Sequence, residues 1–205
     1  MPTSKVDIAN LALTKLGSNE KLTSLSDNSV AARAMNRLYD PVRQAELRRR
    51  HWSFSIVRTS VAASATTPDW GFGYAYPLPA DFLRAVPVSD YFVVPSLSDY
   101  TSQDASAFAF EVVGGVRCIV TDFTAPLKLR YVYDVTDEGQ FDPLFVMAFA
   151  ARLAFEACEQ ITNSNTKKQA CQQDYQMSVR EALAANAIEK PPQPFADDSW
   201  VIARL

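Results

Sequence analysis

The spacing of hydrophobic residues changes twice along the chain, first from a helical period to a strand period and then back. Near the N-terminus, Ile8, Ala12 and Leu16 recur every four residues behind a capping box at Ser4 to Asp7. A second apolar stripe follows after a polar loop, at spacings of three and four: Ala31, Ala34, Met35, Leu38, Val42 and Ala45. These patterns predict two helices within residues 1–50.

Pro41 interrupts the second stripe and leaves two interpretations of it open. Proline removes a backbone hydrogen bond inside a helix, but it is tolerated in a first helical turn, and Asp40 directly before it can cap a helix. Residues 31–50 therefore form either one kinked helix or two shorter helices placed end to end.

From Trp52 onward the period of the apolar residues is two, which is typical of strands. Phe54 and Ile56 alternate with serines, and the segment LKLRYVYDV places five large residues on one face: Leu127, Leu129, Tyr131, Tyr133 and Val135. Between FAFEVV and VRCIV, Gly114 and Gly115 supply the positive φ angles of a tight two-residue turn. We predict antiparallel strands through about residue 139, with a hairpin at this glycine pair. Two prolines favour short or irregular strands in the earlier part of the region: Pro87 and Pro95.

Helical spacing returns at Asp142, which precedes Pro143 as a cap precedes the first residue of a helix. The helix predicted to run to about Ile161 is almost entirely apolar, with one narrow polar stripe: Arg152, Glu156 and Glu159. Such a helix needs cover on several sides, and neighbouring subunits are one source of that cover. A second capping box, Thr166 to Gln169, predicts a further helix to about Ile188 with four residues on its buried face: Cys171, Tyr175, Val179 and Ala182.

The order of these elements predicts an α+β protein. Neither helix pair alone buries enough surface, so we predict a four-helix bundle built from the N- and C-terminal helix pairs, residues 1–50 and 140–189, with an inserted antiparallel β domain, residues 51–139. Residues 190–205, KPPQPFADDSWVIARL, begin with prolines that favour an extended chain. This C-terminal tail carries large apolar residues that a disordered tail would lack: Phe195, Trp200, Val201, Ile202 and Leu205. It is predicted either to dock on a partner or to fold back on its own bundle.

Composition and charge place the 205-residue chain among ordinary globular proteins, with 48% hydrophobic and 21% charged residues. The formal net charge of -3 and the pI of about 5.2 argue against a protein whose main task is binding nucleic-acid phosphates. The sequence has no run of about 18 consecutive apolar residues, and MPTSKVDIAN lacks the layout of a signal peptide. We therefore expect no membrane insertion and folding in the cytoplasm.

Candidate metal and redox groups are sparse. The cysteines, Cys118, Cys158 and Cys171, are scattered without a C-x-x-C pair, and His51 is the only histidine. This set does not predict a zinc site, and the sequence predicts no other metal or cofactor. We expect three buried free thiols, although a disulfide between Cys158 and Cys171 stays open from the sequence alone.

Catalytic groups are no better supported than metal ligands. His51 is a possible general base, but no G-x-S-x-G motif offers it a serine, and a packed histidine at a helix-to-strand junction is the simpler interpretation. Asp197 and Asp198 lie in the predicted tail, and further acids lie in a connector: Asp134, Asp137 and Glu138. The glycines of WGFGYAYPLP favour turns, because no helix N-terminus follows them to bind phosphate. We predict no catalytic residue and no enzyme activity.

The segment RQAELRRRHWSF concentrates positive charge where the predicted helix meets the predicted strand: Arg43, Arg48, Arg49 and Arg50. Arginines at the end of a helix complement the negative end of its dipole, which favours a structural joint between two parts of the fold. A nucleic-acid groove is a second interpretation, which the overall acidity disfavours. Ion pairs to acids of a neighbouring subunit are a third, and we favour them over DNA binding.

Five segments, spread over nearly the whole chain, share their order and residues with one known family: IANLALTKLG, AARAMNRLYDPVRQAELRRRHWSFSIVR, YAYPLPADFLR, LKLRYVYDVTD and QFDPLFVMAFAARLAFEACEQITNSNTKKQ. The phrases YDPVR, YPLPADF and ITNSNTK are the most specific. In these segments the chain resembles the tail tubular protein A family, the head-to-tail adaptors of short-tailed bacteriophages.

The resemblance implies a virion structural protein, assembled in the host cytoplasm, that forms a dodecameric ring between the portal protein and the tail nozzle protein. Such a ring lines the DNA ejection channel, and double-stranded DNA passes through it without specific binding. The C-terminal segment of these adaptors reaches onto the portal, which implies a portal-docking role for the apolar residues of the tail. Candidate contacts between subunits are six charged residues: Arg43, Arg48, Arg49, Arg50, Arg152 and Glu156.

A second function stays open beside the adaptor role. Some members of the family have been proposed to attack cell-wall polymers, so the alternative is a hydrolase of peptidoglycan or polysaccharide carried in the tail. The sequence offers no pair of acids on which to place that reaction, and the family offers no catalytic motif to carry over.

Overall fold

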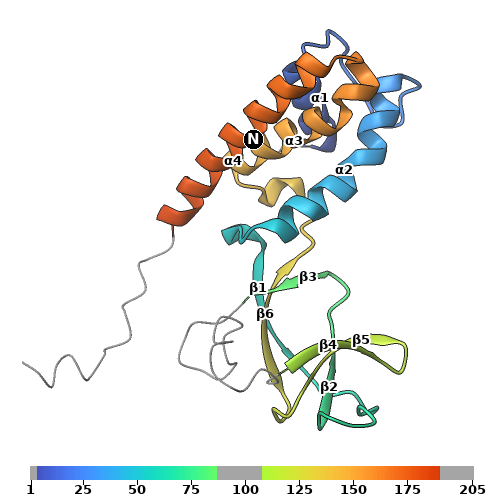
Figure 1. Cartoon of the computed structure of the whole chain (residues 1–205), viewed down its shortest axis with the longest axis vertical. Helices are drawn as coiled ribbons and strands as arrows, with labels where there is room; N and C mark the ends of the chain where they lie inside the picture. Colours follow the sequence, from blue (N-terminus) through green and yellow to red (C-terminus); the bar gives the residue numbers. More distant parts are fainter. Residues whose placement is uncertain (1–3, 87–107, 190–205) are drawn as a thin grey trace, which may run out of the picture.

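The computed structural model describes residues 4–86 and 108–189, which form a helical part and a β part placed end to end (Figure 1). The helical part contains α1 (Lys5–Lys15), α2 (Val30–Arg49), α3 (Pro143–Thr162) and α4 (Asn165–Ile188). The β part contains β1 (Ile56–Val61), β2 (Tyr74–Pro77), β3 (Phe82–Ala85), β4 (Phe108–Val113), β5 (Val116–Thr121) and β6 (Leu127–Tyr133). The strand pairs in these residues are all antiparallel, so the predicted α+β class is confirmed.

Helix α3 forms the centre of the helical part, where α1, α2 and α4 all pack against it. Its buried residues face in several directions: Phe145, Ala148, Phe149, Ala150, Ala151, Leu153, Ala154, Ala157 and Cys158. Burial on several faces explains why the apolar stripe of this helix is so wide. Because helices of the same chain cover α3, its composition does not require the neighbouring subunits that the sequence left open as a source of cover.

The starts of α1 and α3 follow the sequence prediction. The Ser4 hydroxyl accepts a hydrogen bond from the Asp7 amide, and the Asp7 carboxylate accepts one from the Ser4 amide, which is the reciprocal pattern of a capping box. The Asp142 carboxylate accepts hydrogen bonds from the amides of Leu144 and Phe145 at 2.8 and 3.1 Å, with Pro143 in the first turn.

Helix α2 continues through Pro41 as one element of 20 residues, so the interpretation with two separate helices is wrong. Its buried face also differs from the predicted stripe near the end. Ala45 is exposed, whereas Glu46 and Leu47 are buried. The Tyr175 hydroxyl on α4 donates to the Glu46 carboxylate at 2.8 Å, and this bond allows a charged residue to occupy the buried position.

Helix α4 begins earlier than the predicted capping box. The turn between α3 and α4 places Asn163 in the left-handed region, at φ 49°, and the Ser164 hydroxyl then accepts a hydrogen bond from the Lys167 amide. Ser164 is therefore the cap instead of Thr166, because the short left-handed turn brings the chain into α4 directly after Asn163. The buried face of α4 is as predicted: Cys171, Tyr175, Val179 and Ala182.

The prediction of a strand starting at Trp52 is wrong for its first residues. Ser53–Ser55 form a short 3-10 helix, η1, and β1 begins at Ile56. The amide and the hydroxyl of Ser55 both donate to the Trp52 carbonyl at 3.0 Å, which closes this tight turn. The turn packs the rings of Trp52 and Phe54 against Phe145 of α3, each with a centroid distance of 5.0 Å.

Within the described residues, the strands form two three-stranded sheets, one in the order β1-β6-β3 and the other in the order β2-β5-β4. Gly114 and Gly115, at φ 59° and 81°, join β4 to β5, so the predicted hairpin is confirmed. Alternate residues of β6 pack with the second sheet in one cluster: Tyr76, Ile119, Leu127, Leu129 and Tyr131. Val132 on the opposite face of β6 is buried with the helical core, so this strand contributes to both cores.

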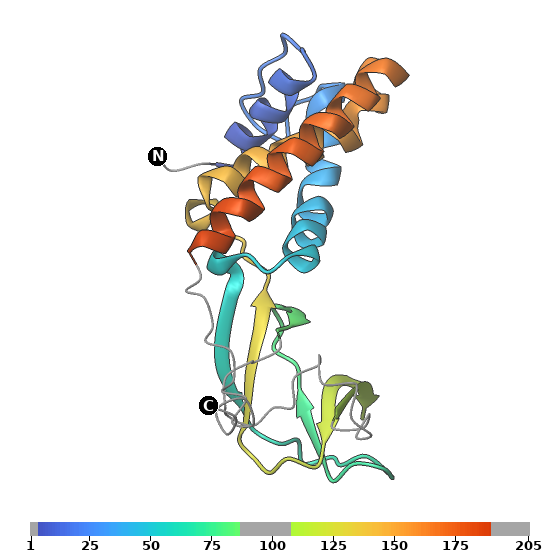
Figure 2. The same ribbon diagram turned by 60° about the vertical axis from the view of Figure 1, so that its left-hand side comes forward.

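The β part lies between α2 and α3 in the sequence, and the chain crosses between the two parts twice. We call the crossing region, residues 50–55 and 134–142, the joint; it includes the 3-10 helix η2 (Glu138–Gln140). In Figure 2, β1 and β6 run side by side below the helices, and β6 leads back toward α3. The predicted strands near Pro87 and Pro95 and the predicted tail lie outside the described residues. None of the described helices is both long and apolar enough to span a lipid bilayer.

Candidate interaction site

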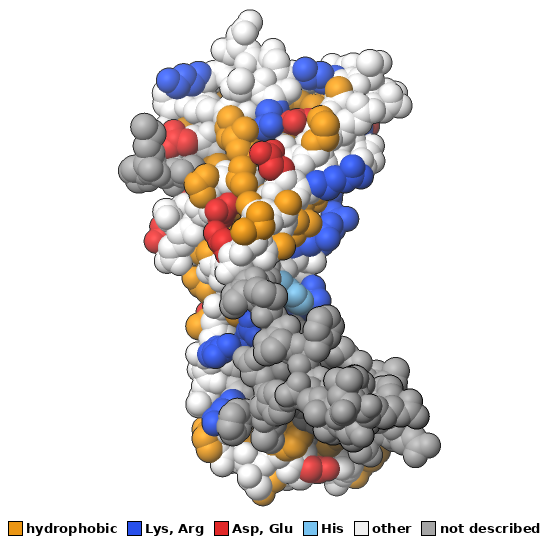
Figure 3. All heavy atoms as spheres, turned by 90° about the vertical axis from the view of Figure 1, so that its left-hand side faces the viewer, with side chains coloured by type: hydrophobic (Ala, Val, Ile, Leu, Met, Phe, Trp, Pro, Cys, Tyr) orange, Lys and Arg blue, Asp and Glu red, His pale blue; other side chains and the backbone are white. Residues whose placement is uncertain are grey.

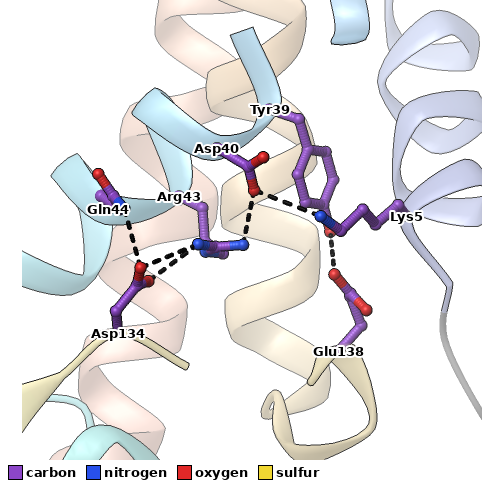
Figure 4. A network of polar contacts seen from close by, with 7 residues as sticks. All are labelled: Lys5, Tyr39, Asp40, Arg43, Gln44, Asp134 and Glu138. Atoms are coloured by element: carbon purple, nitrogen blue, oxygen red, sulfur yellow. Dashed lines mark hydrogen bonds and ion pairs between the residues drawn. The ribbon is translucent and has the colours of Figure 1, made fainter. Parts of the chain in front are cut away.

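The first candidate group of polar residues connects the two parts of the molecule through Arg43 (Figure 4). The guanidinium of Arg43, which is only 3% exposed, donates to Asp40 at 2.7 Å and to both oxygens of Asp134 at 2.9 and 3.1 Å. The Gln44 amide also donates to Asp134, at 2.8 Å. Because Arg43 belongs to α2 and Asp134 directly follows β6, this charge network attaches the β part to the helical part.

A second contact in Figure 4 connects α2 to the 3-10 helix η2. The Tyr39 hydroxyl donates to the Glu138 carboxylate at 3.3 Å, and Lys5 lies over the Tyr39 ring at 5.3 Å from its centroid. Burial raises the pKa of Tyr39, and the charge of Glu138 raises it further, so the hydroxyl keeps its proton and stays a donor. Two of the acids that the sequence places in a connector, Asp134 and Glu138, therefore have structural partners.

Arg48 and Arg84 connect α2 to β3. The Arg48 guanidinium donates to the Leu83 carbonyl, while the Arg84 guanidinium donates to the carbonyls of Arg48 and Arg49 at 3.3 and 3.5 Å. The two bonds from Arg84 supply partners to carbonyls at the end of α2, which have no hydrogen-bond partner within the helix. Arg43 and Arg48 are thus used within the chain, and their predicted contacts to a neighbouring subunit stay a prediction.

The other three arginines among the predicted contact residues line a surface groove of about 300 Å³ between the end of α2, α3 and α4. We call it the arginine groove: its charged lining comes from Arg49, Arg50, Arg152 and Arg180, and its apolar lining from Phe155, Val179 and Leu183. Figure 3 shows Lys and Arg side chains gathered along one edge of the helical part, above the narrow waist of the molecule. The structure therefore brings Arg152 together with two predicted contact arginines, Arg49 and Arg50, that lie about a hundred residues before it in the sequence.

Arg152 contacts both acidic and aromatic side chains beside this groove. It pairs with Glu156 at 2.5 Å and approaches Glu46 at 4.0 Å, and its guanidinium lies over the rings of Phe155 and Tyr175 at 5.5 and 5.2 Å. These contacts hold the guanidinium in place by charge and by cation-π attraction. Glu156, the sixth predicted contact residue, is thus the partner of Arg152 within the same chain.

Tyr175 connects the buried acid to the groove. Its hydroxyl donates to Glu46 at 2.8 Å and accepts from the Arg49 guanidinium at 3.2 Å. Burial raises the pKa of Tyr175 to about 12, and the charge of Glu46 contributes to the rise. Four arginines against two carboxylates leave the groove with an excess of positive charge.

Arg180 is the groove residue that sequence reasoning missed. It follows Val179 of the buried α4 face, and it forms no ion pair with any residue in the described part of the chain. The sequence showed an isolated arginine on a mixed helix. Only the packing of α4 on α3 places it opposite Arg49 and Arg50, so no local signal was available to find it.

The remaining candidate residues are the single histidine, the three cysteines and the residues of the predicted tail. The His51 carbonyl, in the joint, accepts a hydrogen bond from the Asn186 amide at 3.0 Å. All three cysteines are buried and free, which excludes the disulfide between Cys158 and Cys171. Within residues 4–86 and 108–189, no group of three or more His, Cys, Asp or Glu side chains is placed to hold a metal ion. The predicted docking residues Phe195, Trp200, Val201, Ile202 and Leu205 lie outside the described residues, together with Asp197 and Asp198.

No protein-family model matches this chain, and a search of curated proteins gave no significant match.

Proposed function

We propose that this protein is a virion structural protein of the tail tubular protein A type, a ring-forming adaptor that joins the portal to the tail nozzle and lines the DNA ejection channel. The observation that carries the proposal is the position of the three most specific shared phrases. YDPVR contains the Asp40–Arg43 pair of α2, whose arginine bonds to Asp134 in the joint, and ITNSNTK contains Asn163 and Ser164 of the turn between α3 and α4.

The third phrase, YPLPADF, spans residues 76–82, and its residues hold the β part together. The Tyr76 hydroxyl donates to the Phe123 carbonyl at 2.5 Å, and Asp81 accepts from the Tyr131 hydroxyl at 3.0 Å. The phrases that the chain shares with the family therefore contain residues whose hydrogen bonds, ion pairs and helix caps stabilise this fold. This agreement supports a shared fold, from which the adaptor role follows by analogy.

The proposal extends to the organisation of the chain. Residues 1–50 and 140–189 would form the four-helix bundle of an adaptor, residues 51–139 its inserted β domain, and residues 190–205 the tail that reaches the portal. In this arrangement α3 supplies the bundle core, because α1, α2 and α4 pack on it. The acidic net charge of -3 suits a channel that DNA must leave, since basic walls would retain it.

The arginine groove is the proposed contact between subunits of the dodecameric ring. Its excess positive charge and its apolar lining suit a protein surface that presents carboxylates beside apolar side chains. A DNA backbone is a weaker fit, because phosphates gain nothing from the apolar side chains that line part of this groove, Phe155, Val179 and Leu183. Arginine forms paired bonds to carboxylates, which gives such a contact geometric specificity.

Charge reversal in the groove tests this proposal. The double variant Arg49→Glu, Arg180→Glu is expected to reduce ring formation on portal rings at least about tenfold, since two like-charge contacts replace two attractive ones at each interface. Its affinity for double-stranded DNA should change less than twofold. The measurement is ring yield by electron microscopy, with DNA binding measured by fluorescence anisotropy.

Arg33→Glu is the matched control, because Arg33 is an exposed arginine at the other end of α2. This control should form rings as the unchanged protein does. If the groove variant forms normal rings but loses DNA affinity, the groove is a nucleic-acid site and the subunit contact lies elsewhere.

A further inference from the structure

A second pocket, of about 230 Å³, lies in the joint beneath the end of α4. We call it the joint pocket. Its lining comes from the two segments of the joint and from the end of α4. The joint supplies Trp52, Ser53 and Phe54 at η1 and Gln140 and Phe141 at the end of η2, and α4 supplies Asn186 with its C-cap residue Glu189. Glu189 is the last residue that the structure describes, so the chain leaves the described fold at the rim of this pocket.

The walls of the joint pocket are aromatic. The rings of Phe54 and Phe141 lie 5.8 Å apart, and both pack on Phe145 of α3 with centroid distances of 5.0 and 5.1 Å. Trp52 backs this group and is almost fully buried. These contacts fix the rings in place, so the pocket is formed in the absence of any ligand.

The rim of the pocket is polar and also fixed. The Asn186 amide oxygen accepts from the amide and the hydroxyl of Ser53 at 2.8 and 2.5 Å, and its nitrogen donates to the His51 carbonyl. The Gln140 nitrogen donates to Asp137 at 3.2 Å. Each of these amide nitrogens carries a second hydrogen beyond the one used in these bonds, so the rim can still donate to a backbone carbonyl.

The four residues that follow Lys190 have the chemistry that such a pocket recognises. Pro191-Pro192-Gln193-Pro194 is a proline-rich stretch that favours the polyproline II conformation, in which backbone carbonyls make no bonds within the segment. Grooves that bind this conformation combine aromatic rings, which pack against proline rings, with side-chain donors for the carbonyls. The joint pocket offers both groups.

The position of the segment in the chain favours it over any other occupant. A polyproline II chain advances about 3.1 Å per residue, so Pro191 begins within about 6 Å of Glu189 along the chain and Pro194 lies about 16 Å away. A segment tethered at the rim has an effective concentration in the range of millimolar. A separate molecule with the same intrinsic affinity for the pocket must exceed that concentration to compete.

We propose that the joint pocket binds residues 191–194 of its own chain. Occupation of the pocket ties the end of α4 to the joint and sets the direction in which residues 195–205 leave the molecule. Because the end of α4 and both segments of the joint line the pocket, the bound segment also braces α4 against the joint. This inference concerns the isolated protein and holds whether or not the adaptor role is correct.

Disulfide trapping in the full-length protein tests the inference. The variant Gln193→Cys, Gln140→Cys places one thiol in the segment and one on the pocket rim, while Cys118, Cys158 and Cys171 are buried and do not compete. Under mild oxidation we expect an intrachain disulfide in most molecules, identified by peptide mass after digestion. Replacing Pro192 and Pro194 with glycine in this variant should slow the cross-link at least about fivefold, because the segment loses its extended preference.

The matched control is Gln193→Cys with Gln172→Cys, whose second thiol lines the arginine groove more than two turns of α4 further from the joint. It should remain unlinked. Ser53→Cys on the other side of the rim replaces Gln140→Cys if circular dichroism shows that the first variant is not folded. Equal linking rates for the two pairs would overturn the proposal, and so would links found only between two chains, because the occupant would then be a second copy.

Discussion

Glu46 is a buried carboxylate in the helical core, with 3% of its surface exposed. A charge at such a position is costly unless hydrogen bonds and opposite charge compensate it. Tyr175 supplies the hydrogen bond at 2.8 Å, and Arg152 lies 4.0 Å from the same oxygen. The chain therefore uses one buried acid to hold Tyr175 and Arg152 where they form the wall of the arginine groove.

Removing the Tyr175 hydroxyl should change how stability depends on pH. The pKa of Tyr175 is raised to about 12 in the folded protein, whereas an unfolded tyrosine titrates at about 10. Between these values the folded protein keeps a proton that the unfolded chain has lost, so stability falls as pH rises through this window. We expect Tyr175→Phe to make this decline shallower by up to about one proton, and to cost about 1–2 kcal/mol at pH 7 because Glu46 loses its donor.

The measurement is the free energy of unfolding in urea at pH values from about 7 to 11.5. Tyr74→Phe, which removes a hydroxyl from a strand of the β part, serves as the comparison for a general effect of hydroxyl loss. An unchanged slope in Tyr175→Phe would mean that burial and the contact with Glu46 do not raise the pKa of Tyr175 in the folded protein.

Among the elements, the hairpin between β4 and β5 needs a particular backbone conformation at its turn, where Gly115 makes no packing contact. Gly115 has φ 81°, and a Cβ atom added there would meet nothing within 4 Å. The only cost of a side chain at this position is therefore the left-handed backbone. Gly73 provides the opposite case, because its φ lies outside the left-handed region and an added Cβ would come to 3.5 Å from Asp122, an ordinary contact.

Gly115→Ala is expected to lower the free energy of unfolding by about 1–2 kcal/mol, since alanine must adopt a positive φ or distort the turn. Gly73→Ala should change it by less than about 0.5 kcal/mol. Thermal and urea unfolding of the two variants, prepared side by side, measure the difference. Equal destabilisation would show that the turn relaxes freely and that the positive φ is not required.

The sequence predicted the elements whose signals are local. The capping box at Ser4, the cap at Asp142 and the glycine pair of the hairpin each contain their whole signal within a few neighbouring residues, and the structure agrees with all three. The turn at Ser53–Ser55 was mistaken for a strand because Trp52 and Phe54 alternate with serines, as strand residues do. Both rings face α3, and that packing was not visible in the pattern.

The candidate site was predicted only in part for the same reason. The arginines at the end of α2 were conspicuous in the sequence, but their separate roles depend on contacts with β3, α3 and α4. Arg48 bonds the Leu83 carbonyl, whereas Arg49 bonds the Tyr175 hydroxyl, and no local rule distinguishes the two residues. Arg180 and the buried position of Glu46 required the packing of α4 to be known.

At the scale of the whole molecule, two parts with separate cores are held together by a joint of specific polar bonds. Arg43, Tyr39 and Arg48 each bond from α2 to a residue of the β part or of the joint. The Asn186 side chain adds bonds from α4 to the same region. These bonds favour one geometry between the two parts, and the proposed adaptor role requires such a geometry for contact with a ring at each end.

The measurement that tests the adaptor role most directly is the molar mass of the protein alone and after mixing with portal rings, by light scattering on a sizing column. We predict a discrete complex whose added mass corresponds to a dodecameric set of subunits. The same chain ended at Lys190 should fold but add no mass to the portal. If the full-length protein elutes at its own mass with the portal present, the adaptor role is contradicted, and the release of soluble fragments from peptidoglycan becomes the next assay.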